Sequence, residues 1–327
     1  MSWLRKSDRE RADEQLAIPD APAGVLQVCH PDWRGVRSSA LAFRDPVVET
    51  CDLDVLTPHA DALLSSGVTT VVIQGWPPNA LGFATAASHA GLRVLAVFHS
   101  SPGQHGIDIG EAEAVNEMLN LQRAGIIHGV ASVKAGLSEP FRVLGYEISP
   151  LSNRVPDLSD VEPASVPEGV NVGIFLHPMW RKNVTTQALA ALQLGWHPFV
   201  MADPQVPYLS SDDLTVCGEL PRDEFLSLQA GMDMTFNVTF SECHPMQPME
   251  SYVLGVPCLV SRTSSLFTDD RELWELTTVD RADDPTAIAD QAARLMDAAS
   301  EAVSRAQVSL SRLDETSAGL WEAFTRS

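Results

Sequence analysis

The sequence predicts an α/β protein with two parallel-sheet domains. Two observations support this prediction. Short β-rich runs alternate with longer helical runs along most of the 327-residue chain, which is the pattern of parallel α/β domains. The alternation stops once, in a Pro- and Ser-rich segment without a clear period, and then restarts. That segment is therefore interpreted as a linker between two domains that face a cleft.

The first half contains four expected strands and two expected helices. The strands are expected at 24–30, 68–76, 92–100 and 126–133, and the helices at 78–91 and 110–125. Both helices end in glycine, at Gly91 and Gly125, which suits a left-handed cap at a helix C-terminus.

The alternation resumes after residue 169 and ends in a long helix-permissive tail. Strands are expected at 170–178, 197–203, 214–218, 234–240 and 256–262, and helices at 184–195, 221–232, 248–255 and through most of 285–326. The predicted organisation is a flexible leader (1–21), an N-terminal domain (22–150), a linker (151–169), a C-terminal domain (170–300) and a C-terminal helix (301–327), with the option that this helix packs back on the first domain.

Composition excludes several classes of protein. Hydrophobic residues make up 45% of the chain, enough for full cores, and no apolar run reaches the roughly 18–20 residues of a membrane helix. The five cysteines are odd in number and contain no C-x-x-C, which favours reduced thiols in a cytoplasmic protein. The net charge is −21, with the acidic excess concentrated in the second half, and this disfavours nucleic acid or anionic lipid as a partner. A local basic pocket for one anionic ligand remains compatible with it.

The segment "SECHPMQPMESYVLGVP" places two carboxylates, Glu242 and Glu250, where a strand ends and a helix begins near Pro248. The backbone N–H groups of Met246 and Gln247 lie near that helix start, where unpaired donors and the helix dipole favour an anion. Two acids for hydroxyl groups and a set of amides for phosphate suit a nucleotide sugar. The alternative interpretation is structural: Glu250 complements the helix dipole and Glu242 caps a loop.

Three other places carry residues that can act on such a ligand. Arg181 and Lys182 form an adjacent basic pair between a strand and a helix, where positive charge opposes the helix dipole. Gly35 lies in the turn after the first strand and allows close backbone approach, and His99 ends a strand expected to be central. Each also has a structural interpretation, as solvated side chains, an ordinary turn or a satisfied histidine. No group of His, Cys and Asp has metal-ligand spacing, so no metal site is expected.

Together these elements resemble the retaining GT-B glycosyltransferases, most nearly glycosyltransferase family 4. The family motif E-x7-E, followed by a small residue, an apolar run and G-x-P, is matched by Glu242, Glu250, Ser251 and the triplet from Gly255 to Pro257. The likeness extends from about 172 to 261 and is weak elsewhere. It implies two Rossmann-like domains and transfer of a hexose or similar sugar from a UDP- or GDP-sugar to an acceptor hydroxyl, without a metal or other cofactor.

The resemblance also implies roles for individual residues. Glu242 would hold hydroxyls of the transferred sugar, Lys182 would bind the diphosphate, and His99 would contact the donor sugar. Further donor-binding positions are Gly35, Arg181, Cys217, Gly218, Leu220, Met246, Gln247 and Glu250, with Glu250 on the ribose diol and the residues 217, 218 and 220 near the base.

The chain departs from the family pattern at two places. Phe175 and Leu176 stand where the family has Gly-Arg, so Arg181 is a candidate for the missing charge, and Pro245 removes one amide donor. Two alternatives therefore stay open: a GT-B-like nucleotide-sugar epimerase, and a non-catalytic binding protein on the same fold. The sequence does not identify the acceptor, and it predicts no integral membrane segment.

Overall fold

The structure is a computed structural model that describes residue 19, residues 21–210 and residues 212–326. The predicted leader, 1–21, lies almost entirely outside the described residues. Contacts divide the chain into two units, one extending to Arg154 and including the residues from Ser317 on, the other running from Val155 to Thr316.

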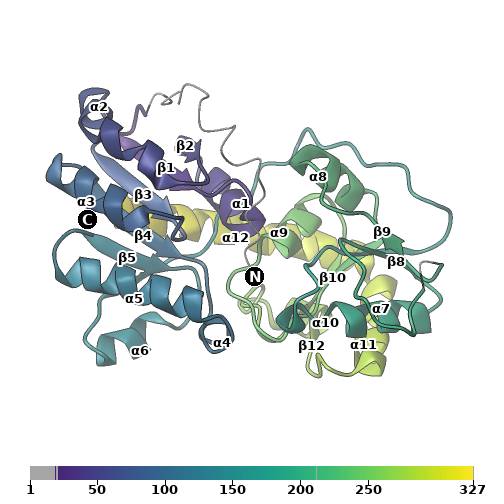
Figure 1. Cartoon of the computed structure of the whole chain (residues 1–327). Helices are drawn as coiled ribbons and strands as arrows, with labels where there is room; N and C mark the ends of the chain where they lie inside the picture. Colours follow the sequence, from purple (N-terminus) through teal and green to yellow (C-terminus); the bar gives the residue numbers. More distant parts are fainter. Residues whose placement is uncertain (1–18, 20, 211, 327) are drawn as a thin grey trace. The chain divides into compact units, whose positions relative to one another are not determined.

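The first unit contains a six-stranded parallel sheet in the order β2-β1-β3-β4-β5-β6. Figure 1 labels β1 to β5 of this sheet. Its strands are β1 (Val25–Cys29), β2 (Val47–Glu49), β3 (Thr70–Gln74), β4 (Arg93–Phe98), β5 (Gly129–Ser132) and β6 (Ile148–Pro150). Its helices are α1 (Arg34–Ala42), α2 (Ala60–Ser65), α3 (Ala80–His89), α4 (Pro102–His105), α5 (Ile109–Arg123) and α6 (Ser138–Val143), with 3-10 turns η1 (Leu53–Val55) and η2 (Thr57–His59).

The apolar runs of β1, β3 and β4 explain this sheet. Their residues are almost all buried, as expected for strands covered on both faces by helices. Leu26, Ile73 and Phe83 are among the fully buried members of the core. Helices α3 and α5 are followed by Gly91 and Gly125 at positive φ, where only glycine is free of strain, so both helices end where the sequence predicts.

The second unit contains another six-stranded parallel sheet, in the order β12-β11-β10-β7-β8-β9. Its strands are β7 (Asn171–Ile174), β8 (His197–Val200), β9 (Thr215–Val216), β10 (Met234–Asn237), β11 (Cys258–Ser261) and β12 (Thr278–Val279). Its helices are α7 (Val184–Gln193), α8 (Arg222–Ala230), α9 (Met246–Val253), α10 (Arg271–Thr277) and α11 (Pro285–Asp297), with the 3-10 turn η3 (Trp180–Lys182) before α7.

The last helix, α12 (Ala299–Arg326), begins in the second unit and ends in the first. In the first unit its Trp321 stacks on Phe43 with ring centroids 4.0 Å apart, and the indole N–H donates to Asp45 Oδ2 at 2.6 Å. The C-terminal residues therefore complete the core of the unit that the N-terminal half builds.

Several predicted boundaries differ from the observed ones. Helix α9 begins at Met246, two residues before the predicted start, because proline needs no N–H in a first turn and Pro248 fits inside it. Strand β10 ends at Asn237, so Glu242 lies in a loop after the strand. The Pro- and Ser-rich segment that interrupts the alternation, 146–169, is not all irregular. Just before the predicted linker, 151–169, it contains the edge strand β6, which is too short to show a period.

The remaining part of that segment packs on helix α8 of the second unit. Ala164 N–H donates to Ser227 O at 2.8 Å. A Cβ added at Gly231 would lie 2.5 Å from Ala164 O, so glycine is required for this close approach. The chain before β7 is thus held in place by backbone contacts that leave no periodic pattern in the sequence.

Candidate functional site

Lys182 and Glu242, the two predicted catalytic residues of the second unit, form an ion pair. Lys182 Nζ lies 2.6 Å from Glu242 Oε2, and the two side chains are only 15% and 13% exposed. Lys182 follows β7 and Glu242 follows β10, and these strands are neighbours in the sheet. Because the carboxyl ends of parallel strands meet at one edge, the fold brings together residues that are distant in the sequence.

Backbone contacts hold the two loops that carry this pair. Phe240 N–H donates to Arg181 O at 2.8 Å, and the rings of Trp180 and Phe240 lie 5.2 Å apart. The ammonium and the carboxylate are therefore positioned by their backbones as well as by their mutual attraction. A ligand that carries an anionic group next to hydroxyl groups could bind both: the ammonium of Lys182 would pair with the anion, and the carboxylate of Glu242 would accept hydrogen bonds from the hydroxyls.

Arg181 has an unusual environment for an arginine. Its Nη1 is buried and has no hydrogen-bond partner among the described residues. A buried guanidinium nitrogen without a partner costs free energy, which an anionic ligand would recover. The two positions that hold Gly-Arg in the family pattern are apolar and buried here. Phe175, at the glycine position, packs over Gly173 and against Phe225 at a ring distance of 5.3 Å, and Leu176 stands at the arginine position.

The start of α9 presents backbone donors without a side-chain cap. Its N-cap residue, Pro245, has no side-chain acceptor to offer the first-turn N–H groups, which include those of Met246 and Gln247. Asn237 Nδ2 donates to Gln247 Oε1 at 2.6 Å, while Gln247 Nε2 and Asn237 Oδ1 are buried and have no hydrogen-bond partner within the described residues. This end of the helix can bind an oxygen-rich anion.

Glu250 lies in the second turn of α9 and is 3% exposed. The structural interpretation from the sequence, that it complements the helix dipole in the first turn, is therefore wrong. It pairs instead with Arg222 at the start of α8, with Nη2 3.1 Å from Oε1. Sequence reasoning missed Arg222, although a basic residue directly after Pro221, in the segment predicted to lie near the base, was a usable signal.

The predicted base-binding residues lie between β9 and α8. Cys217 N–H donates to Val200 O at 2.8 Å, and burial raises the pKa of its thiol to about 11, so the group stays protonated. Gly218 has φ +72°, which requires glycine. The chain then reaches Leu220 and, two residues later, the Arg222 that holds Glu250.

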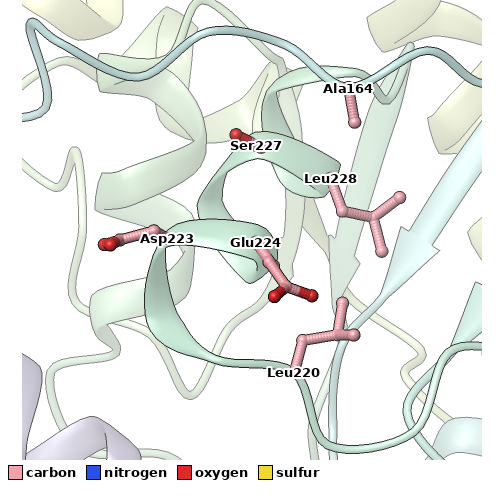
Figure 2. A pocket seen from close by; sticks show the side chains of 6 residues that line it. All are labelled: Ala164, Leu220, Asp223, Glu224, Ser227 and Leu228. Atoms are coloured by element: carbon pink, nitrogen blue, oxygen red, sulfur yellow. The ribbon is translucent and has the colours of Figure 1, made fainter.

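Leu220 lines a surface hollow of about 470 Å³ beside α8. Its lining consists of Ala164, Leu220, Asp223, Glu224, Ser227 and Leu228. Figure 2 shows these six side chains, with Leu220, Leu228 and Glu224 on one side of the helix turn and Asp223 on the other. The hollow offers apolar contact and the carboxylates of Asp223 and Glu224 to a flat ring.

In the first unit, His99 follows the central strand β4 and ends a chain of buried amides. Its Nε2 lies 2.8 Å from Gln74 Oε1, Gln74 Nε2 donates to Gln27 Oε1, and Gln27 Nε2 donates to Ala40 O. Because Gln74 Oε1 can only accept, His99 Nε2 carries the proton and Nδ1 is an acceptor. Burial lowers the pKa of His99 to about 4, so the neutral ring suits a sugar hydroxyl and not a phosphate.

Gly35 does not lie in a turn, as predicted, but is the second residue of helix α1. Its φ is not positive, and an added Cβ would meet nothing within 4 Å. The helix starts early because the turn after β1 is short, and Trp33 N–H donates to His30 O at 3.3 Å within this turn. The structure therefore gives no local reason for glycine at this position.

We expect His99 to make the protein less stable in acid. Its folded pKa of about 4 lies below the ordinary 6.5, so the unfolded chain binds a proton first as the pH falls. Above about pH 6.5 the neutral ring imposes no loss on the free energy of unfolding. Below that pH the free energy falls by about 1.4 kcal/mol per pH unit, which amounts to a loss of about 3 kcal/mol by pH 4. Denaturant unfolding at several pH values should show a shallower loss for His99→Gln; equal slopes for both proteins would contradict the assignment.

No family model matches the chain, and no curated protein sequence matches it. Several solved structures do match this chain. The Anabaena protein Alr3699/HepE in complex with UDP is 13% identical, with a TM-score of 0.62 over 91% of this chain and 99% of that one. Its structure with UDP and glucose has a TM-score of 0.63 at 12% identity, over the same shares of both chains.

Two other matches are with larger proteins. Sucrose-phosphate synthase from Thermosynechococcus elongatus is 14% identical, with a TM-score of 0.55 over 84% of this chain and 76% of that one. TarM is 13% identical, with a TM-score of 0.58 over 79% of this chain, which spans only 55% of TarM. At these identities the likeness concerns the fold. It confirms the predicted class of two Rossmann-like parallel-sheet units of the GT-B type with a C-terminal helix, while membership of family 4 stays a prediction.

Proposed function

We propose that the protein is a glycosyltransferase that moves a sugar from a nucleotide-diphosphate sugar to an acceptor hydroxyl, with retention at the anomeric carbon. The observation that carries the proposal is the largely buried pair of Lys182 and Glu242 at the carboxyl edge of the second sheet. It places a cation for a leaving diphosphate beside an acceptor for sugar hydroxyls. The fold is that of several solved glycosyltransferases, and the HepE structures contain UDP.

In the proposed reaction the bond between the anomeric carbon and the phosphate oxygen breaks, and the diphosphate leaves with the bonding electrons. The acceptor oxygen attacks on the same face, and its proton passes to the leaving phosphate oxygen. The Lys182 ammonium, the Arg181 guanidinium and the N–H groups at the start of α9 stabilise the charge that grows on the diphosphate. Glu242 fixes the sugar through its hydroxyls.

The other parts of the donor have proposed positions in the second unit. Glu250, oriented by Arg222, accepts hydrogen bonds from the ribose diol, and the segment containing Cys217, Gly218 and Leu220 lies against the base. Nδ1 of His99 in the first unit accepts a hydrogen bond from a hydroxyl group of the donor sugar. Because these charges come from side chains and amides, the proposed transfer requires no metal and should continue in EDTA.

A cytoplasmic location remains part of the proposal, because no disulfide joins the five cysteines, all of which lie in the described part of the chain. No helix in the described part of the chain is long and apolar enough to cross a membrane.

We expect one class of nucleotide sugar to raise the melting temperature in a thermal-shift screen, beginning with UDP-sugars and continuing with GDP- and ADP-sugars. A ligand that binds only the folded state raises the free energy of unfolding by about 2.7 kcal/mol when its concentration is a hundred times its Kd. The matched control is Glu250→Gln, which should show a smaller shift with the same ligand.

The same sugars, incubated without acceptor, separate the alternatives. An intact donor supports a transferase that waits for its acceptor. A sugar released with altered stereochemistry would identify an epimerase, and no shift with any nucleotide sugar would point to a protein without donor binding.

A further inference from the structure

Three side chains with metal-binding chemistry meet in the first unit, outside the residues used above. One ligand atom each from His30, Asp32 and Cys51 lies within 4.8 Å of the other two. The sequence predicted no such group, because Cys51 follows a different strand from His30 and Asp32. Strand pairing, which spacing along the chain does not report, brings them together.

The register of β1 and β2 explains why these residues meet. The two strands are parallel, with Cys29 opposite Glu49. One further hydrogen bond, from Thr50 N–H to Cys29 O at 3.0 Å, extends the ladder past both strand ends. His30 and Cys51 therefore leave the sheet side by side at its carboxyl edge, the edge at which such sheets bind ligands.

Local contacts hold the two residues in place without a metal. The His30 ring stacks on Trp33 with centroids 4.9 Å apart and planes at 15°, and its Nδ1 accepts from Asp32 N–H at 3.2 Å. On either side of Cys51, Thr50 Oγ1 donates to Asp52 O at 2.8 Å and accepts from Asp52 N–H at 3.2 Å, which holds the backbone turn that carries the cysteine. Side chains held in advance lose less entropy when they bind an ion.

We propose that His30, Asp32 and Cys51 bind one divalent transition-metal ion of the zinc type. A thiolate, an imidazole and a carboxylate are the ligands of Zn²⁺ and Co²⁺, whereas Mg²⁺ and Ca²⁺ require oxygen ligands. His30 contributes a lone pair of one ring nitrogen to the ion. Binding also displaces the proton of the Cys51 thiol.

Three protein ligands leave the fourth position of a tetrahedral ion open. His30 and Cys51 are half-buried and Asp32 is exposed, so water or an oxygen of a small ligand can reach that position. Ligand distances of about 2.0–2.3 Å require the three atoms to close in slightly, and the exposed Asp32 side chain is free of packing that would prevent this.

The test is a titration of the reduced full chain with Co²⁺ followed by absorption. We expect one ion per chain, a thiolate-to-cobalt charge-transfer band in the near ultraviolet, and visible bands as intense as those of tetrahedral Co²⁺. Zn²⁺ should displace the cobalt and Mg²⁺ should not. Absence of binding, or binding without the charge-transfer band, would overturn the proposal.

Variants separate this site from chance binding elsewhere. Cys51→Ser, His30→Gln and Asp32→Asn should each weaken Zn²⁺ binding at least about tenfold by calorimetry. The matched controls Cys217→Ser and His89→Gln should not. Thermal unfolding in EDTA checks that each variant folds, and unchanged affinity in folded Cys51→Ser and His30→Gln would sink the assignment.

This inference does not rest on the proposed transfer. Its readouts are stoichiometry, spectrum and affinity, whereas the transfer assay can be run in EDTA. A chain that binds no cobalt can still transfer sugar, and a chain that transfers no sugar can still bind cobalt.

Discussion

Replacing Lys182 with methionine is expected to reduce sugar transfer by about 10²–10³-fold, because the leaving diphosphate loses a charge placed to stabilise it. Methionine keeps the length of the side chain and removes only the ammonium. Glu242→Gln should also be strongly impaired, since the amide keeps one acceptor but loses the charge-assisted hydrogen bonds to sugar hydroxyls. Turnover of a nucleotide sugar with a competent acceptor measures both effects.

Stability measurements must accompany these assays, because Lys182 and Glu242 neutralise one another in a largely buried place. Removing one partner leaves a buried charge, and we expect a loss of about 3 kcal/mol, the low end for buried pairs. The double variant Lys182→Met with Glu242→Gln should recover most of this loss while remaining inactive. Recovery of both stability and activity would show that the pair is only structural.

The matched control is an exposed ion pair in the same unit. Arg271 and Glu275 lie 2.8 Å apart with side chains 88% and 56% exposed. Arg271→Met should change stability by less than about 1 kcal/mol and leave transfer unchanged. The Arg271→Met variant is expected to keep the turnover of the parent. If folded Lys182→Met also keeps turnover within tenfold of the parent, Lys182 has no role in the reaction.

Replacing Arg222 with methionine is expected to have the largest effect on stability, about 3–5 kcal/mol. Glu250 is almost fully buried, and helix α9 carries no Lys or Arg, so the loss of Arg222 leaves a carboxylate in a poorly solvated place. Replacing both residues with methionine should restore most of the lost stability, because a buried ion pair is rarely worth more than well-packed apolar groups. Denaturant unfolding of the two single variants and the double variant measures this coupling.

Nucleotide binding distinguishes two roles of the ion pair between Arg222 and Glu250. In one role Arg222 orients Glu250 for donor binding, and in the other the pair only stabilises the fold. Calorimetry with UDP should show weak or no binding by the double variant even where it is as stable as the parent. Glu250→Gln should weaken binding by roughly tenfold or more, because hydrogen bonds to a charged acceptor contribute about 1.5–3 kcal/mol. If the stable double variant binds UDP as tightly as the parent, Glu250 and Arg222 do not contribute to the donor site.

Local features of the sequence were enough for the fold class. The apolar strands such as β3 and β4, the glycines after α3 and α5, and Asp270 and Asp284 as the N-caps of α10 and α11 all act over a few residues. Interactions of such short range can be recognised in a single sequence, because the residues that make them are close together along the chain. The same alternation indicates that Lys182 and Glu242 each follow a strand.

Only the tertiary structure decided which groups meet. Lys182 and Glu242 are 60 positions apart, and Arg222 and Glu250 are 28 apart, so no local pattern pairs them. Strand order and register also bring Cys51 to His30, and they connect His99 to Gln74 and Gln27. The physical reason is that charge pairing, burial and proton location depend on distances through space, which the chain acquires when its strands align.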